Sequence, residues 1–255
     1  SRQELKIMME INIEMIMAVL LSLAMIMKSA AHARASSIGY KNRVLIVACE
    51  PELKKLSPET RSILENDLGF HILISGVGKI NAAKCAMFAR CMGADIIVNV
   101  GTAGSHVYGK GTLVIPNRTA QRDMDATDIM RQFRPNYPKH LTPFEESICR
   151  QIDLSKLVIP DDVKVIVGSK ENPVTCWTGD NTHAYTEKSE VMDGAVIEME
   201  GDAIAAINAR VHHTTHTTLL IKWISDNADE NVGEEWAENA DGIPWETIVK
   251  ILVAN

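Results

Sequence analysis

The amino-acid sequence predicts an α/β protein, in which a single domain holds a central mixed, mostly parallel sheet flanked by helices on both faces. Two observations carry this prediction. Short apolar segments rich in Val and Ile alternate with helical patterns, and 46% of the 255 residues are hydrophobic, which is enough for one sizeable core. The domain is expected over residues 37–255, behind a separate amino-terminal segment at 1–36.

The predicted strands are short runs of branched, apolar side chains bounded by polar residues or glycine. Residues 43–49 form the first of them, with the sequence RVLIVAC. The same character recurs at 71–75, 95–100, 113–115, 163–167, 195–199 and 218–224.

Helical patterns lie between several of these runs. Ser57 and Pro58 suit the N-cap and the first position of a helix over 58–66, because a serine side chain accepts from free backbone N–H groups and proline needs none. Further helices are expected at 82–92, 143–152, 202–211 and 245–253. In such an alternating fold, ligands bind beyond the carboxyl ends of the strands, so the residues that follow each strand become the candidates for function.

The amino-terminal segment has a different pattern. Twelve of the thirteen residues 15–27 are apolar, and Ala-His-Ala at 31–33 has the form of a signal-peptidase site, which indicates an exported or periplasmic protein. Glu4, Glu10 and Glu14 are unusual in a signal peptide, so a helix packed on the body of a cytoplasmic protein is the alternative. The run is shorter than the ~20 residues of a spanning helix, and no stable membrane span is expected.

Composition and charge exclude several classes of function. The net charge is −7 and no cluster of Lys and Arg is present, so no nucleic-acid partner is expected. Five cysteines form no CxxC pair, and Asp123 and Asp125 lack companion ligands at metal spacing. The sequence therefore predicts no metal and no cofactor, and the expected partner is a small molecule.

Carboxylates follow three of the predicted strands. Glu52 comes after the first strand, Glu198 and Glu200 end another, and Asp226 follows the apolar run 218–224. An aspartate beside apolar walls can hold a proton and donate it to a leaving group. The structural alternatives are a solvated loop for Glu52, a helix cap or salt bridge for the glutamate pair and an Asx turn for Asp226.

Small residues follow two other strands, at Gly76-Val77-Gly78 and at Gly101-Thr102-Ala103-Gly104. Glycine lets a backbone approach a ligand or turn tightly, so each motif is either a pocket wall or a plain turn. Trp236 is either a core aromatic residue or an apolar lid.

Five motifs occur in the order seen in one known group of enzymes. They lie at 75–79, 99–104, 178–180, 198–200 and 225–229, and the resemblance covers residues 43–253. The chain resembles the nucleoside phosphorylase and nucleosidase superfamily, and it is most similar to the methylthioadenosine/S-adenosylhomocysteine nucleosidases. The resemblance implies hydrolysis of the N-glycosidic bond of a purine nucleoside with release of adenine. The alternatives are a purine nucleoside phosphorylase and a non-catalytic nucleoside-binding or storage protein on the same fold.

The resemblance also implies roles for individual residues. Glu52 is the expected general base, Glu200 the acceptor for ribose hydroxyls, and Asp226 the proton donor to the base. The expected substrate-binding residues are Val77, Thr102, Gly104, Thr182, His183, Glu198, Met199, Ser225 and Trp236. A homodimer is expected by the same resemblance.

Three features depart from the family pattern or leave the reaction open. The stretch 53–70 is too short for the family's additional hairpin, so a reduced sheet is expected there. Thr182 stands where the family has an aromatic residue that stacks on adenine, and Trp177 or His183 would have to replace it. Asn99 favours water over phosphate, although Arg118 and Arg122 keep phosphorolysis open.

Overall fold

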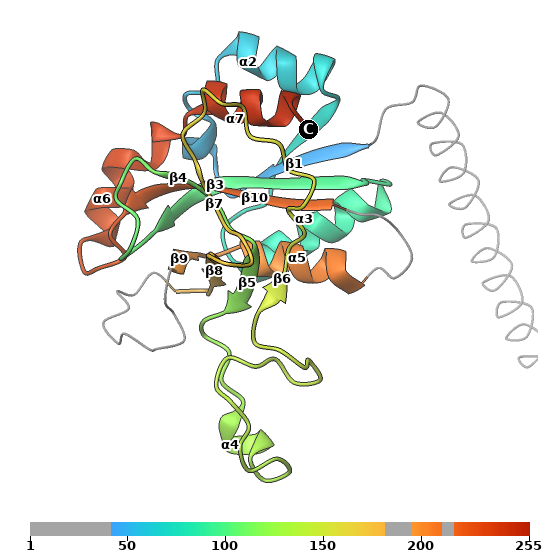
Figure 1. Cartoon of the computed structure of the whole chain (residues 1–255), viewed down its shortest axis with the longest axis vertical. Helices are drawn as coiled ribbons and strands as arrows, with labels where there is room; N and C mark the ends of the chain where they lie inside the picture. Colours follow the sequence, from blue (N-terminus) through green and yellow to red (C-terminus); the bar gives the residue numbers. More distant parts are fainter. Residues whose placement is uncertain (1–41, 182–194, 211–216) are drawn as a thin grey trace, which may run out of the picture. The chain divides into compact units, whose positions relative to one another are not determined.

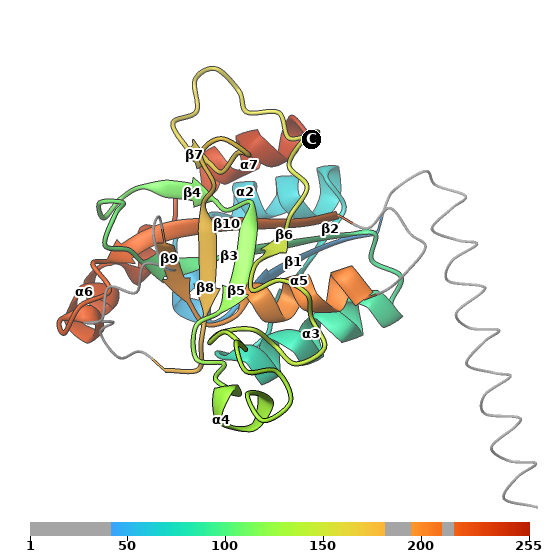
Figure 2. The same ribbon diagram turned by 60° about the horizontal axis from the view of Figure 1, so that its bottom comes forward.

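The computed structural model describes residues 42–181, 195–210 and 217–255. Within this range Arg43–Asn255 form one compact unit, which Figures 1 and 2 show from two sides. The amino-terminal segment expected at 1–36 lies outside the described residues, as do Thr182 and His183 of the expected substrate-binding set.

A mixed sheet forms the centre of the unit (Figure 1). Its strands in the described part of the chain are β1 (Arg43–Val47), β2 (Phe70–Ile74), β3 (Ile96–Gly104), β4 (Leu113–Ile115), β5 (Arg118–Gln121), β6 (Arg150–Gln151), β7 (Ile166–Val167), β8 (Thr175–Thr178), β9 (Ala195–Glu198) and β10 (Thr217–Asp226). The strands β2, β1, β3 and β10 lie side by side and parallel. A second parallel group joins β5, β8 and β9, whereas β4, β6 and β9 make antiparallel contacts with β10, β5 and β3. The predicted mixed, mostly parallel sheet is therefore confirmed.

The pairing of the strands brings several carboxyl ends together. Because β1, β3 and β10 run parallel, they end at the same edge of the sheet. β9 reaches that edge through the pairing of Ile197 with Gly104, the last residue of β3. The residues that follow β1, β9 and β10 are consequently neighbours in space, although they are far apart in sequence.

Helices cover both faces of the sheet (Figure 2). They are α2 (Pro58–Ser62), α3 (Lys79–Cys91), α4 (Thr127–Met130), α5 (Gly201–Arg210), α6 (Val232–Asn239) and α7 (Trp245–Val253), together with the shorter turns η1 (Glu50–Leu53), η2 (Ile63–Asp67) and η4 (Ala240–Gly242). Successive residues of a strand face opposite sides. Val44 and Ile46 of β1 pack in one core with residues of α3 and α5, whereas Leu45 and Val47 pack in the other with α7.

Several local predictions hold. Ser57 caps α2, because its side chain accepts from the Thr60 N–H at 3.1 Å and Pro58 follows as the first helical residue. The segment between Glu52 and β2 contains α2 and η2 and no strand, so a short helical connection leads from β1 to its parallel neighbour. None of the helices in the described ranges is long and apolar enough to cross a membrane.

The helix predicted at 143–152 is wrong. That segment forms turns and ends in β6, where Arg150 pairs with Thr119 of β5. The apolar residues Ile148 and Cys149, which suit one face of a helix, pack instead against the small core around Trp177. The side chain of Arg150 is drawn inward by Asp202 and Glu145, and these ion pairs favour the extended backbone.

The sequence pattern also missed β5 and β8. The four residues of β8, Thr-Cys-Trp-Thr, are all buried, so they show none of the polar and apolar alternation that marks a half-exposed strand. The hydroxyl of Thr178 is nevertheless satisfied, because it donates to the carboxylate of Glu198. From the sequence alone, a threonine whose partner lies inside the protein cannot be distinguished from a threonine in an exposed loop.

Candidate active site

A pocket of about 320 Å³ opens at the sheet edge where β1, β3, β9 and β10 end. Pockets of this size take small molecules. Most of the residues singled out from the sequence line it. These are Glu52, Val77, Thr102, Gly104, Glu198, Met199, Glu200, Asp226 and Trp236.

Glu52 lies on one side of the pocket, in the short turn η1 that follows β1. One of its oxygens, Oε1, accepts from the backbone N–H and the hydroxyl of Thr102, at 2.7 and 3.0 Å. The other, Oε2, accepts from the N–H groups of Ala48 and Cys49, at 2.8 and 3.4 Å. Only 3% of the residue is exposed. The turn therefore holds a buried carboxylate against β3 with its position fixed by backbone donors.

Asp226 lies at the end of β10. Its Oδ2 accepts from the hydroxyl of Ser225 at 2.8 Å, and its Oδ1 accepts from the N–H of Ala228 at 3.0 Å. Burial raises the pKa of Asp226, and the two hydrogen bonds only partly offset this. A carboxyl group with a raised pKa can carry a proton into the site and release it to a leaving group.

Gly104 makes room for this aspartate. A Cβ atom built on Gly104 would lie 2.2 Å from Oδ1 of Asp226 and 2.8 Å from Cβ of Ala228. Thr102, which holds Glu52, is two residues earlier on β3, so about 7 Å of strand separates the two contact points. The strand β3 thus sets the separation between the carboxylates of Glu52 and Asp226. Ser225 itself is fully buried and does not line the pocket, and its hydroxyl lies 2.8 Å from Oδ2 of Asp226 and 3.3 Å from the carbonyl oxygen of Ala103.

Glu200 follows β9 at the start of α5. Its Oε1 accepts from the N–H of Gly78 at 2.8 Å, and the side chain is 6% exposed. Burial and the neighbouring charge of Glu198 raise the pKa of Glu200 to about 7. With one protein donor on its carboxylate, Glu200 has acceptor capacity left for hydroxyl groups of a ligand.

Apolar and aromatic side chains complete the walls. Met199 lies between the two glutamates in sequence, and Val77 comes from the turn before α3. The indole N–H of Trp236, on α6, donates to the Thr102 hydroxyl at 2.9 Å, so Trp236 closes one side of the pocket rather than the hydrophobic core. This hydrogen bond also joins α6 to the hydroxyl that holds Glu52.

Arg122 and Asn181 form another part of the wall. The guanidinium of Arg122 donates through both terminal nitrogens to the backbone and side-chain oxygens of Asn181. Nearby, Asp180 accepts from the first N–H of α3, at Lys79, at 2.7 Å, and its own N–H donates to Asp123. Asp123 is thus part of a link between loops. In the described part of the chain, no group of three or more His, Cys, Asp or Glu is arranged to hold a metal ion.

Sequence reasoning missed several residues of the site. Cys49 and Asn181 line the pocket, and Lys222 lies buried with its ammonium on Glu198, which borders the pocket. Lys222 carried a usable signal, because a lysine in the middle of the apolar run TTLLIKWISD needs a buried partner. Arg122, which the sequence singled out as a possible phosphate ligand, also lines the pocket.

The mixed sheet and the buried carboxylates beyond its strand ends place this chain among the α/β proteins that bind a small molecule at the carboxyl ends of their strands. The family model described as the phosphorylase superfamily matches residues 43–243. The chain belongs to that superfamily, and the resemblance found in the sequence is confirmed.

Known proteins with similar sequence or fold carry nucleosidase names. A 5′-methylthioadenosine/S-adenosylhomocysteine nucleosidase of Buchnera aphidicola is 29% identical over 191 residues, which cover 72% of this chain and 79% of that protein. The nucleosidase of the same name from Neisseria meningitidis, solved with methylthio-immucillin-A, shares the fold with a TM-score of 0.65 and 22% identity, over 84% of this chain and all of that one. Futalosine hydrolase of Helicobacter pylori shares it with a TM-score of 0.64 and 16% identity, over 84% and 96% of the two chains.

Proposed function

We propose that this protein is a nucleosidase that hydrolyses the N-glycosidic bond of 5′-methylthioadenosine or S-adenosylhomocysteine and releases adenine. The observation that carries the proposal is the convergence of Glu52, Glu200 and Asp226 on one pocket with apolar walls. Membership of the phosphorylase superfamily and the names of the relatives support the same reaction.

Asp226 is the proton donor to the base. When the bond between C1′ and N9 breaks, its electron pair moves onto the purine, and a proton placed on N7 neutralises that charge. Burial raises the pKa of Asp226, which favours the protonated carboxyl group that this step requires. A carboxyl group can also distinguish a 6-amino purine, because it donates to N7 while its second oxygen accepts from the amino group.

Glu52 is the base for water. As the sugar becomes positively charged, a water oxygen bonds to C1′ and its proton moves to the Glu52 carboxylate. The four donors on Glu52 keep the carboxylate fixed. After the reaction one proton lies on Glu52 and one has left Asp226, and exchange with solvent restores both groups.

Glu200 binds the ribose. A sugar diol offers two hydroxyl donors, and the Glu200 carboxylate has acceptor positions beyond the one used by Gly78. Hydrogen bonds from hydroxyl groups stabilise the charged form, so substrate binding lowers the pKa of Glu200 from about 7. Met199 and Trp236 supply apolar surface for the ribose and the 5′ substituent.

The pocket favours water over phosphate as the nucleophile. The guanidinium of Arg122, which lines the pocket, is turned toward Asn181 and donates to it through both terminal nitrogens. Arg118 pairs in β5 with Thr175 and does not line the pocket. Asn99, which precedes the small residues at the end of β3, uses its amide to bind the Ile46 carbonyl at 3.1 Å and so ties β3 to β1.

The same proposal includes a homodimer. Helix α3 carries large apolar side chains on its exposed face, with Ile80 82%, Phe88 56% and Met87 46% exposed. Exposed apolar patches of this kind are typical of subunit contacts. Val77, which precedes α3 and lines the pocket, would bring the contact close to the site. Sedimentation at micromolar concentration tests this, and a monomer would contradict it.

The domain boundary is part of the proposal as well. We assign catalysis to residues 37–255 and treat residues 1–36 as a separate segment, in keeping with the compact unit Arg43–Asn255. A chain that begins at residue 37 should release adenine at the rate of the full chain. A large loss of activity on removal of 1–36 would place that segment in the catalytic unit.

The reaction is tested by adenine release from 5′-methylthioadenosine with and without phosphate. Hydrolysis predicts the same rate in both buffers. Strict dependence on phosphate would identify a phosphorylase, and binding without any release would identify a nucleoside-binding protein. Because futalosine hydrolase shares the fold, futalosine is the comparison substrate. Faster turnover of futalosine would change the assigned substrate but not the type of bond cleaved.

A further inference from the structure

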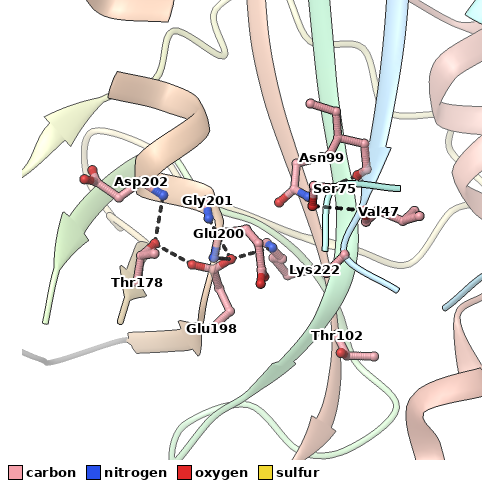
Figure 3. Close-up of polar contacts among 12 residues, drawn as sticks. Val47, Ser75, Asn99, Thr102, Thr178, Glu198, Glu200, Gly201, Asp202 and Lys222 are labelled. Atoms are coloured by element: carbon pink, nitrogen blue, oxygen red, sulfur yellow. Dashed lines mark hydrogen bonds and ion pairs between the residues drawn. The ribbon is translucent and has the colours of Figure 1, made fainter. Parts of the chain in front are cut away.

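A lysine lies completely buried at the centre of the sheet. Lys222 is 0% exposed and stands in β10 between Ile221 and Trp223, four residues before Asp226. Its ammonium donates to Oε2 of Glu198 at 2.7 Å (Figure 3). Burying two charges costs free energy even when they pair, so such a pair is retained where it does something that apolar side chains cannot do.

The Glu198 carboxylate is occupied by protein donors on both oxygens. Oε1 accepts from the hydroxyl of Thr178. Oε2 accepts from the ammonium of Lys222 and from the N–H groups of Glu200 and Gly201, at 2.7, 2.9 and 2.8 Å. A carboxylate has about four acceptor positions. Glu198 therefore has little capacity left for a substrate hydroxyl, although it borders the pocket.

Two of these donors are backbone groups of the turn that carries Glu200. Oε2 of Glu198 fixes the N–H of Glu200 and the N–H of the next residue, where α5 begins. Figure 3 shows Lys222 and Glu198 beside this turn, with Thr178 and Asp202 continuing the network. The turn has no space to relax, because a Cβ on Gly201 would lie 3.0 Å from both Cys176 and Leu220.

We propose that the buried Lys222–Glu198 ion pair positions the Glu200 carboxylate for the ribose diol, with Lys222 and Glu198 acting through Glu200 rather than on the substrate. This inference rests on the proposed function of the same site. Lys222 keeps Glu198 ionised, ionised Glu198 holds the two N–H groups of the turn, and the turn sets the direction of the Glu200 side chain.

The electrostatics agree with this assignment. Burial alone raises the pKa of Glu198, but the charge and hydrogen bond of Lys222 outweigh it and hold this pKa below its usual value. The charge of Glu198 in turn overcomes the effect of burial on Lys222 and raises the pKa of the lysine. Both groups thus remain charged at neutral pH.

The neighbouring strand has a glycine at the position paired with Lys222, and the Glu52 carboxylate accounts for it. Gly101 pairs with Lys222 across β3 and β10. A Cβ on Gly101 would lie 3.6 Å from the ammonium of Lys222 and 3.0 Å from Oε1 of Glu52. Gly101 therefore leaves room for the Glu52 carboxylate, and a side chain there would also contact the ammonium of Lys222.

The test compares two substrates, 5′-methylthioadenosine and its 2′,3′-dideoxy analogue. Lys222→Met removes the charge and Glu198→Gln keeps the shape of the carboxylate, while Glu200→Gln is the reference variant. Both Lys222→Met and Glu198→Gln should lower kcat/KM for the ribonucleoside, by up to about 100-fold for a misplaced group. Both should have a much smaller effect on kcat/KM for the dideoxy analogue, the pattern expected of Glu200→Gln. Combined with Glu200→Gln, neither change should lower the activity further.

An equal loss on both substrates would overturn the proposal, because it would show a general structural role. Unchanged activity on the ribonucleoside would overturn it as well. Should Lys222→Met not fold, Glu198→Gln carries the same comparison. If the wild type releases no adenine, the proposed function fails. Calorimetric binding of the two nucleosides by the wild type and the variants then still tests the positioning role of Lys222 and Glu198. A loss of affinity for the ribonucleoside alone supports this role, and an equal loss for both nucleosides overturns it.

Discussion

Glu198 and Glu200 stand two residues apart at the end of one strand, yet they have opposite surroundings. Glu198 receives four protein donors, including a buried ammonium, whereas Glu200 receives one backbone donor and borders the pocket. Asp226 and Asp202 differ in a similar way, because Asp226 lines the pocket, whereas Asp202 is held by Thr119 and Arg150 and does not line it. A carboxylate at a strand end thus serves either the substrate or the fold, and the groups around it decide which.

The largest effect on catalysis is expected from a change at Asp226. Asp226→Asn keeps the shape of the side chain and removes the proton that it donates, so kcat should fall by about 10²- to 10⁴-fold. The melting temperature should change little, because no buried ion pair is lost. Steady-state kinetics with thermal unfolding on the same sample checks both, and near-normal turnover would remove Asp226 from the mechanism.

The opposite result is expected at Glu198, where stability should suffer. Glu198→Gln leaves the Lys222 ammonium buried without its partner, and breaking one side of a buried pair costs about 3–5 kcal/mol. Denaturant unfolding measures this loss. As a control, Glu198→Gln combined with Lys222→Met removes both charges and should recover part of it. A single variant as stable as the wild type would contradict the structural role.

A smaller effect is expected from the glycine that makes room for Asp226. In Gly104→Ala the new Cβ would meet Oδ1 of Asp226 at 2.2 Å, so the carboxyl group has to move. A misplacement of this kind should lower kcat/KM by about 100-fold or less. Gly109→Ala is the matched control, because nothing lies within 4 Å of a Cβ there. Equal activities of the two variants would argue against a precise position for Asp226.

The smallest effect concerns the pH dependence of stability. Burial and Glu198 raise the pKa of Glu200 from 4.5 to about 7. An acid with a raised pKa in the folded state stabilises the fold below its unfolded value, and this contribution is lost as the pH rises through about 7. Without substrate, Glu200→Gln should therefore match the wild type near pH 4 and melt at a higher temperature at pH 8. A constant difference between the two proteins over this range would contradict the shift.

The strand ends were predictable from the sequence because they depend on local pattern. The runs before Glu52 and Asp226 are apolar and branched, and both carboxylates border the pocket. The predicted helix at 143–152 failed for the opposite reason, since Arg150 is held by Asp202, a residue far away in sequence. Lys222 shows the same limit, because only the fold reveals that its partner is Glu198.

The difference between Asp226, which acts on the substrate, and Glu198, which is held by four protein donors, is tested most directly by one measurement. Adenine release from 5′-methylthioadenosine is followed in phosphate-free buffer for the wild type, Asp226→Asn and Glu198→Gln, at a temperature where all three are folded. We expect release by the wild type, a loss of about 10²- to 10⁴-fold in Asp226→Asn, and a smaller loss in Glu198→Gln. A wild type that releases no adenine, or an Asp226→Asn variant more active than Glu198→Gln, would contradict the account.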